Sequence, residues 1–533
     1  MKLPLSLPAG LLACLLLSPV SASADAAMVS GRVYQERDGA PGRGPTDPGL
    51  GGVQVSNGRV IVRTGADGGY RLPVQAGDTV FIVKPDGYRV AAGADGLPAF
   101  WRHFAPQGSP PLRYKGIAPT ATAASGYDFA LVPDRRDPRR GFQMLVFADP
   151  QTATPRDIDH YRTAIVEPLD GKTRARLGVT LGDIVSDDLS LYPAMNAVTT
   201  SLGLPWFHVP GNHDLDLDAG GDGHSLDSWR AVYGPDTYAV EEGGASFLFL
   251  DDVVYEPSAK PAYVGGLRED QFAFIAQYLQ GLRRDRLLVL GLHIPLFDAA
   301  PGRETFRHAD RQRLFALLKE FRNVLVLSGH SHTQQHYYHA AAEGWHGASP
   351  LHEYNVGANC GAFWSGVPGD DGVPDSMMSD GTPKGHALLD VAGDGSYRLH
   401  YRVAGAPESE QIGLHAPKVL RQGAYPAWGV YANVYMGEDG SRVDYRVDGA
   451  AWQPMTQVRQ PDPRLLLENA ADDVAPRLRG HDRSPEATAS PHLWRGALPT
   501  HLPAGTHEVQ VRARQPDGSV FEARTHYTLQ PAP

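Results

Sequence analysis

The pattern of hydrophobic and polar positions divides the chain into three regions. From residue 28 to about 132, apolar and polar residues alternate in short runs such as 29–34, and glycine-rich turns separate these runs. A period of two predicts an all-β N-terminal domain. From 405 to 533 the alternation returns, for example over 430–436, and predicts a C-terminal β domain.

The middle region, 141–404, has a different pattern, in which short apolar runs alternate with segments of helical spacing. The runs that predict strands are 144–148, 177–181, 206–209, 246–250, 286–290 and 324–327, and the segments that predict helices are 158–169, 191–202, 269–282 and 310–321. This order is typical of a layered α/β domain. A polar stretch rich in proline and arginine, 133–140, is expected to link it to the N-terminal domain.

The first 24 residues have the pattern of an export signal. Lys2 supplies a positive charge, 11–17 is a short apolar run, and 22–24 fits a small-residue cleavage site. The run is too short to span a bilayer, and no later segment is apolar enough to do so. We therefore expect a periplasmic or secreted protein without a transmembrane segment. Because 11–14 resembles a lipobox, lipid anchoring at Cys14 is the alternative.

Composition narrows the possible partners. The net charge of −11 argues against non-specific binding to nucleic acids, whose phosphates favour a basic surface. The 59 glycines and 44 prolines favour turn-rich β structure over helical bundles. No partner protein can be named from the sequence.

Five polar clusters in the middle region each follow a predicted strand. They are Asp149-Pro150-Gln151, Gly182-Asp183, Gly211-Asn212-His213-Asp214, Gly291-Leu292-His293 and Gly329-His330-Ser331-His332. Ligands of α/β sheets bind beyond the carboxyl ends of the strands, so we expect the clusters to converge. Carboxylate, imidazole and amide oxygen suit Mn, Fe or Zn. Two such ions lie roughly 3.5–4 Å apart and need a bridging carboxylate, for which Asp183 is suited.

This ordered series resembles the calcineurin-like metallophosphoesterases over about 142–399. The family's series is Asp-x-His, Gly-Asp, Gly-Asn-His-Asp/Glu, a later His, and Gly-His-x-His; residues 211–214 and 329–332 make the match highly specific. The flanking domains are similar to those of an exported bacterial subgroup, and 64–70 resembles a prealbumin-like sandwich. The implied fold is α/β: a layered β-sandwich core flanked by helices, with all-β N-terminal and C-terminal domains.

The resemblance implies a centre of two divalent metal ions. The ligands of the first would be Asp149, Gln151, Asp183 and His332, and those of the second Asp183, Asn212, His293 and His330. His213 would protonate the leaving oxygen or clamp the phosphate, and Asp214 would orient it. Asn212 and His213 would also contact the substrate.

Gln151 departs from the family pattern, which has histidine at this position. An amide oxygen still binds such cations. Some active relatives with Asp-x-Gln are manganese-dependent, so Mn is favoured over Zn. The alternative is that Gln151 only forms hydrogen bonds within its loop.

Residues outside the series leave further alternatives open. Asn359, in a glycine-rich loop with Trp364, is expected to contact the substrate, but a plain turn cluster is the other interpretation. Residues 366–385 are expected to form a lid over the pocket. Asp187 and Asp188 either cap a helix or touch the site.

These features predict a metal-dependent phosphoric ester hydrolase. A hydroxide held between the metals would attack phosphorus in line, and His213 would protonate the departing alkoxide. We favour phosphodiesters, from small molecules or polymers, because open loops and export suit an extracellular scavenger. One alternative is a phosphomonoesterase. The other is a non-catalytic cell-surface or glycan-binding protein on an esterase scaffold, which would purify without stoichiometric metal.

Overall fold

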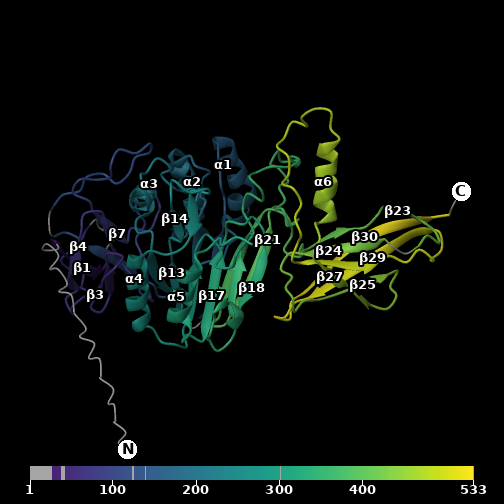
Figure 1. Cartoon of the computed structure of the whole chain (residues 1–533). Helices are drawn as coiled ribbons and strands as arrows, with labels where there is room; N and C mark the ends of the chain where they lie inside the picture. Colours follow the sequence, from purple (N-terminus) through teal and green to yellow (C-terminus); the bar gives the residue numbers. More distant parts are fainter. Residues whose placement is uncertain are drawn as a thin grey trace, which may run out of the picture.

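The computed structural model describes residues 27–37, 42–122, 125–137, 140–300, 302–425 and 428–531. The export signal predicted over 1–24 and Cys14 lie outside these residues. Figure 1 shows three parts in succession: a purple N-terminal module, a central teal and green sandwich, and a yellow C-terminal module. Among the described helices, none has the length and apolar character needed to cross a membrane.

The N-terminal module consists of two four-stranded sheets. The first contains β4 (Gly69–Val74), β1 (Ala27–Gln35), β8 (Phe129–Pro133) and β6 (Tyr88–Val90), and the second contains β3 (Ile61–Arg63), β2 (Gln54–Ser56), β5 (Asp78–Ile82) and β7 (Trp101–Phe104). In β4, Tyr70, Leu72 and Val74 are buried, whereas Arg71 is exposed. The alternation read from the sequence therefore sets which face of the strand joins the core.

The central sandwich has a five-stranded and a six-stranded sheet. The first contains β11 (Trp206–Val209), β10 (Leu177–Leu181), β9 (Phe142–Phe147), β20 (Gly385–Val391) and β21 (Tyr397–Val403), and the second contains β12 (Tyr238–Glu242), β13 (Ala245–Phe249), β16 (Leu287–Gly291), β17 (Asn323–Ser328), β19 (Leu351–Asn355) and β18 (Gln335–His339). The rings of Phe142 and Phe247, from the two sheets, meet at 6.0 Å. This is the layered β-sandwich core expected from the sequence.

Helices flank the sandwich. They are α1 (Pro155–Tyr161), α2 (Tyr192–Thr199), α3 (Asp227–Tyr233), α4 (Glu269–Gln280) and α5 (His308–Leu318). Tyr161 of α1 contacts Phe147 of β9, and Phe315 of α5 contacts His339 of β18, so each helix covers a different sheet. A short hairpin, β14 (Val253–Tyr255) with β15 (Tyr263–Gly265), lies beside the second sheet.

The N-terminal module and the sandwich share one continuous hydrophobic core. Phe100 contacts Phe207 at 6.0 Å across their boundary. Lys84 and Glu242 form a buried ion pair there, with Nζ and Oε2 at 2.6 Å. The stretch 133–140, predicted as a linker, thus connects two units that pack directly against each other.

The C-terminal module has a hydrophobic core of its own. Its first sheet contains β22 (Ile412–His415), β24 (Gly429–Val434), β28 (Leu493–Ala497) and β27 (Thr456–Val458), and its second contains β23 (Val419–Arg421), β30 (Val520–Gln530), β29 (Gly505–Arg514), β25 (Arg442–Val447) and β26 (Gln453–Pro454). Helix α6 (Pro463–Asp473) projects from these sheets (Figure 1).

Parallel pairing fixes where the polar clusters emerge. Strands β9, β10 and β11 run parallel in one sheet, and β13, β16, β17 and β19 run parallel in the other. Because parallel strands end at one edge, all five clusters leave the sheets on the same side.

Candidate metal centre

One group of potential ligands gathers around Asp183. The ligand atoms of Asp183, His293 and His330 all lie within 4.8 Å of one another. The Nε2 atom of His293 is 3.4 Å from Asp183 Oδ1 and 3.1 Å from Asn212 Oδ1. These residues follow four different strands, so the sheet edge assembles them as the sequence predicted.

A second group lies around Asp149. Its Oδ1 is 3.7 Å from Nε2 of His332, and its carboxylate accepts a hydrogen bond from the His330 backbone N–H. The Gln151 backbone N–H donates to the Asp183 carbonyl at 2.8 Å, which joins this group to the first. The Oε1 atom of Gln151 is buried and has no hydrogen-bond partner among the described residues. A buried amide oxygen without a partner is costly unless something else satisfies it.

The backbone at these positions is unusual. Among the described residues, nine that are not glycine have positive φ, and only Asp448 lies far from this region. The others are Asp149, Gln151, Asp183, Asp187, His330, His332, Phe363 and Trp364. Left-handed backbone costs about 1–2 kcal/mol per residue, and clusters of such residues mark functional sites.

The glycines of the motifs are required by contact distances. A Cβ on Gly211 would lie 2.2 Å from Asp183 Oδ1, and a Cβ on Gly182 would lie 2.5 Å from His293 Nδ1. Both distances are shorter than side-chain atoms tolerate. The glycines therefore let the backbone approach the ligand side chains.

Neighbouring polar groups fix the orientation of the histidines. His293 donates from Nδ1 to the Leu181 carbonyl at 2.8 Å, which turns Nε2 toward the cluster. Asp252 accepts hydrogen bonds from the backbone N–H groups of His293 and Ile294. The Asn355 amide donates to Ser331 Oγ and to the Thr333 carbonyl, and so holds the turn that carries His330 and His332.

The electrostatics favour a bound cation. Burial lowers the pKa of His330 to about 3 and that of His332 to about 4, which keeps both rings neutral. Burial, together with the charge of Asp183, raises the pKa of Asp149 to about 7. Burial opposes ionisation of Asp183 itself, but the charge and hydrogen bond of His293 hold its pKa below the usual range. Crowded carboxylates and neutral imidazoles are the donors that divalent metals require.

Asp183, His293 and His330 form one candidate cation site, and the neighbouring group around Asp149 is where we place a second ion. The buried, unpartnered Gln151 Oε1 is an available ligand atom, and Asp183 lies between the two groups. The expected ligands Asp149, Gln151, Asp183, Asn212, His293, His330 and His332 are all brought to one sheet edge, and their assignment as ligands remains a proposal.

His213 has a partner different from the one expected. Its Nδ1 lies 2.8 Å from Oδ1 of Asp187, and its backbone N–H donates to Asp183 Oδ1. Burial lowers the pKa of His213, but the hydrogen bond to Asp187 and the charge of Asp183 raise it overall, to about 9.

The expectation that Asp214 orients His213 is therefore wrong. Asp214 is fully buried and accepts hydrogen bonds from the backbone of Gly211 and Ile184 and from the Tyr192 hydroxyl. These bonds use its carboxylate to hold the loop that carries the Gly-Asn-His-Asp motif. The partner that the motif did not reveal is Asp187, and its place after the Gly-Asp turn was the only signal in the sequence.

The substrate contact expected of Asn359 stays a prediction: its side-chain Oδ1 is buried and has no hydrogen-bond partner among the described residues. The residue is fully buried, and its side-chain N–H donates to the Gly385 carbonyl at 2.7 Å. Trp364 is also buried, and its indole N–H donates to the Pro150 carbonyl. The exposed member of this loop is Phe363, which sequence reasoning missed.

Segment 366–385, expected to form a lid, is exposed over 367–372 and anchored further along. Val373, Met378 and Thr382 are buried, and Asp380 pairs with His492 of the C-terminal module. The Gly366 N–H also donates to the Asp482 carbonyl. The segment is held between the sandwich and the C-terminal module, because its buried side chains and backbone bonds tie it to both.

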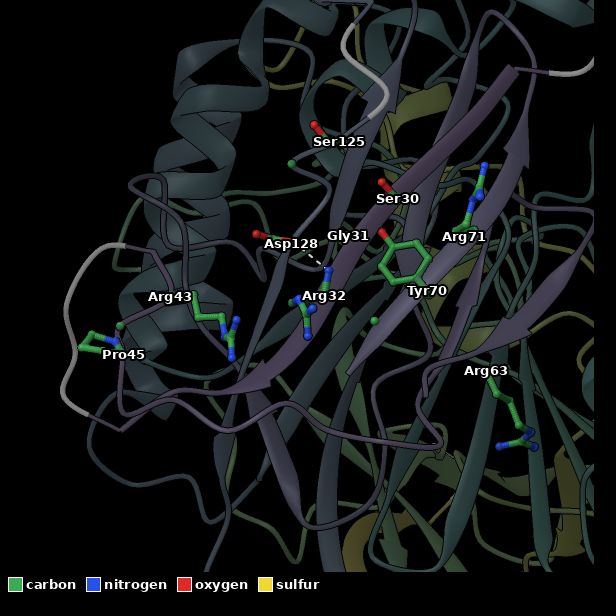
Figure 2. Close-up of a pocket in the computed structure, with 13 residues that line it drawn as sticks. Ser30, Gly31, Arg32, Arg43, Pro45, Arg63, Tyr70, Arg71, Ser125 and Asp128 are labelled. Atoms are coloured by element: carbon green, nitrogen blue, oxygen red, sulfur yellow. Dashed lines mark hydrogen bonds between the residues drawn. The ribbon is translucent and has the colours of Figure 1, made fainter. Parts of the chain in front are cut away.

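A groove of a different kind lies on the N-terminal module. Its volume is about 1190 Å³, and Arg32, Arg43, Arg63 and Arg71 are among its lining residues (Figure 2). Arg32 is paired with Asp67 at 2.6 Å. The described lining residues include no histidine or cysteine, so this groove lacks the ligand chemistry of the metal centre.

A two-sheet sandwich with this cluster of carboxylates and imidazoles at its edge defines a metallophosphoesterase core. Three family models match the chain: N terminal of Calcineurin-like phosphoesterase over 43–114, Calcineurin-like phosphoesterase over 145–334, and C terminal of Calcineurin-like phosphoesterase over 353–521. The chain belongs to the calcineurin-like phosphoesterases, a dimetal-dependent family, and carries the family's N- and C-terminal domains on either side of the core.

Similar solved structures are distant. A dimetal phosphatase from Danio rerio is 14% identical, with 49% of this chain and 98% of that chain covered and a TM-score of 0.33. A purple acid phosphatase from Lupinus luteus is 13% identical, with 67% of each chain covered and a TM-score of 0.36. These likenesses are too remote to carry an argument about activity. No curated protein matches the chain.

Proposed function

We propose that the protein is an exported phosphodiesterase that uses two divalent metal ions. The observation that carries the proposal is the convergence of Asp149, Asp183, His293, His330 and His332 beside the unpartnered Oε1 of Gln151. Bound metals would activate water for attack on phosphorus and neutralise the phosphate oxygens. Manganese is the favoured ion, because an amide oxygen is a harder ligand than imidazole.

The chain's own residues would act on the leaving group. The hydrogen bond to Asp187 raises the pKa of His213, so the ring is protonated at neutral pH. Its ring is 30% exposed, so a substrate can reach it. We assign His213 the role of donating a proton to the departing oxygen, with Asp187 holding its Nδ1. The exposed Phe363 ring lies beside His332 and offers a surface for a second ester substituent, which supports diesters over monoesters.

The test is a panel of phosphomonoesters and phosphodiesters assayed with Mn, Zn and Fe, together with the variant Asp183→Asn. We expect turnover of diesters and loss of both activity and bound metal in the variant. A variant that still turns over substrate would refute the two-metal assignment, and a preference for monoesters would refute the substrate class. Export is tested separately by locating the protein in cell fractions with and without residues 1–24.

A further inference from the structure

A loop of the N-terminal module reaches Asp187, the hydrogen-bond partner of His213. Residues 109–117 form a closed loop, because the Ser109 N–H donates to the Ile117 carbonyl and the Ile117 N–H donates to Ser109 Oγ, both at 2.9 Å. At its tip, the Arg113 N–H donates to Asp218 Oδ2 at 2.7 Å, and the Tyr114 hydroxyl donates to the Asp187 carbonyl at 3.0 Å. The N-terminal module thus touches the residue that pairs with His213.

Asp187 is held from three directions. Its N–H donates to the His213 carbonyl at 3.2 Å, its carboxylate pairs with the His213 ring, and its carbonyl accepts from Tyr114. Its φ is +64°, a strained value for an aspartate. Strained backbone persists only where surrounding contacts enforce it, and the Tyr114 hydroxyl supplies one of these contacts.

We propose that Tyr114 is a positioning residue for the reaction proposed above, on which this inference rests. It acts through Asp187, whose carboxylate direction determines the orientation of the His213 ring. Because His213 would donate its proton only as the ester bond breaks, the contact affects kcat and leaves substrate binding unchanged. The N-terminal module would then contribute to catalysis and not only to stability.

The test compares Tyr114→Phe with the control Tyr70→Phe. The Tyr70 hydroxyl donates a similar hydrogen bond to the Tyr127 carbonyl, within the same module. With Mn, we expect Tyr114→Phe to lower kcat about tenfold for diesters with alkoxide leaving groups and less than about twofold for 4-nitrophenolate, at unchanged KM. Tyr70→Phe should leave kcat unchanged for both kinds of leaving group. Equal losses for both leaving groups, a higher KM or no loss would overturn the proposal.

A second measurement does not depend on turnover. The Nδ1 proton of His213, assigned in proton NMR by its loss in His213→Ala, should broaden in Tyr114→Phe and remain sharp in Tyr70→Phe. An unchanged resonance in Tyr114→Phe would overturn the positioning role. Failure of the wild type on all diesters would refute the proposed function while this measurement still decides the role of Tyr114.

A different observation concerns Phe363. Its side chain is 62% exposed, and its ring centroid lies 4.8 Å from that of His332 at an interplanar angle of 36°. Both Phe363 and the next residue, Trp364, have positive φ. The Trp364 indole is tied to the Pro150 carbonyl, between two of the proposed metal ligands. The loop is thus anchored beneath the centre while the Phe363 ring stays in solvent.

Exposure and backbone strain both cost free energy, and the ring packing that the structure gives Phe363 is its contact with His332. We infer that Phe363 is a platform for an aromatic group of the substrate, such as a nucleobase or phenyl ring attached to the phosphodiester. Stacking on an exposed aromatic ring tolerates any flat group. This inference also rests on the proposed function, because it assigns the substrate class of the same site.

The test uses two diesters with the same leaving group, 4-nitrophenyl phenyl phosphate and 4-nitrophenyl methyl phosphate. We expect Phe363→Ala to lower kcat/KM about tenfold for the phenyl ester and less than about twofold for the methyl ester. Phe363→Tyr should restore the preference, and Trp428→Ala, which removes another exposed ring, should leave it unchanged. Equal losses for the two esters would overturn the platform.

Binding provides the arm that does not require turnover. Calorimetry with Mn present gives the ratio of the affinities for adenosine monophosphate and ribose 5-phosphate. This ratio should be lower in Phe363→Ala than in the wild type. An unchanged ratio would overturn the inference, whether or not any diester is hydrolysed.

Discussion

The Nε2 atom of His492 lies 3.1 Å from Oδ2 of Asp380, and each side chain is only 1% exposed. The pair joins the C-terminal module to the segment between β19 and β20. Asp380 also accepts hydrogen bonds from the backbone N–H groups of Gln334 and Thr382 at 2.7 and 2.8 Å. One carboxylate therefore connects the C-terminal module to Gln334, two residues after His332.

We predict that Asp380→Ala destabilises the protein by about 3 kcal/mol at pH 7, because it leaves buried donors without an acceptor. Burial opposes ionisation, but the hydrogen bond and charge of His492 hold the pKa of Asp380 below its usual value. Its contribution is thus present above about pH 4 and is lost as the pH falls further. Urea unfolding measures both effects.

The control for this prediction is Asp394→Ala, which removes an exposed carboxylate that bonds only Ser396 in its own turn. It should cost less than about 1 kcal/mol. If both variants lost the same stability, the pair would not be a joint between the modules.

Variants of Gln151 distinguish its two interpretations, as a metal ligand or as a residue that only forms hydrogen bonds within its loop. If its buried Oε1 is a metal ligand, Gln151→Ala should weaken retention of one metal by about tenfold or more, and Gln151→His should shift selectivity from Mn toward Zn. Metal content after dialysis against a chelator measures both. Gln143→Ala, which removes an amide on β9 bonded to Asp390, is the control. Full metal retention in Gln151→Ala would restrict this residue to loop structure.

Much of this candidate site could be predicted because each proposed ligand follows closely after a strand. Apolar runs end at Phe147, Leu181, Val209, Gly291 and Ser328, and the parallel pairing of these strands brings the next polar residues together. The local sequence therefore predicted both each strand and the proposed metal ligand that follows it. The glycines beside the ligands added the close approach that the geometry requires.

The remaining features depend on contacts distant in sequence. Strand β20 inserts next to β9 through pairs such as Ala387 with Val146, far apart along the chain. The burial of Asn359 follows from this insertion, because its amide bonds to Gly385 at the start of β20. The partnership of Asp187 with His213 needs a left-handed backbone, which no residue pattern specifies for an aspartate.

Replacing Asp187 should lower kcat, whereas replacing Asp214 should lower stability. We predict that His213→Ala keeps both metals but loses about 100-fold or more in kcat, least for good leaving groups, and that Asp187→Ala shows the same pattern at about tenfold. Asp214→Ala should instead cost about 2 kcal/mol of stability, because three donors lose their acceptor. Steady-state kinetics and metal analysis distinguish these results. Loss of metal in His213→Ala would reassign that residue as a ligand.

The buried ring of His386 should make the free energy of unfolding depend on pH. It lies in β20 with its ring 5.5 Å from Phe147, and both ring nitrogens are buried without a hydrogen-bond partner among the described residues. Burial, aided by the charge of Arg402, lowers its pKa to about 3. The folded protein therefore keeps this ring neutral, while the unfolded chain binds a proton below about pH 6.5.

Stability that depends on His386 is thus fully present above about pH 6.5 and falls as the pH drops toward the folded pKa, by about 1.4 kcal/mol per pH unit. His386→Phe keeps a flat ring in the core and removes the titration. Between pH 7 and pH 5 the wild type should lose about 2 kcal/mol more than this variant in urea unfolding. His346→Ala, at an exposed loop position, should follow the wild type. Parallel pH curves for the wild type and His386→Phe would mean that the His386 ring takes up a proton inside the folded core.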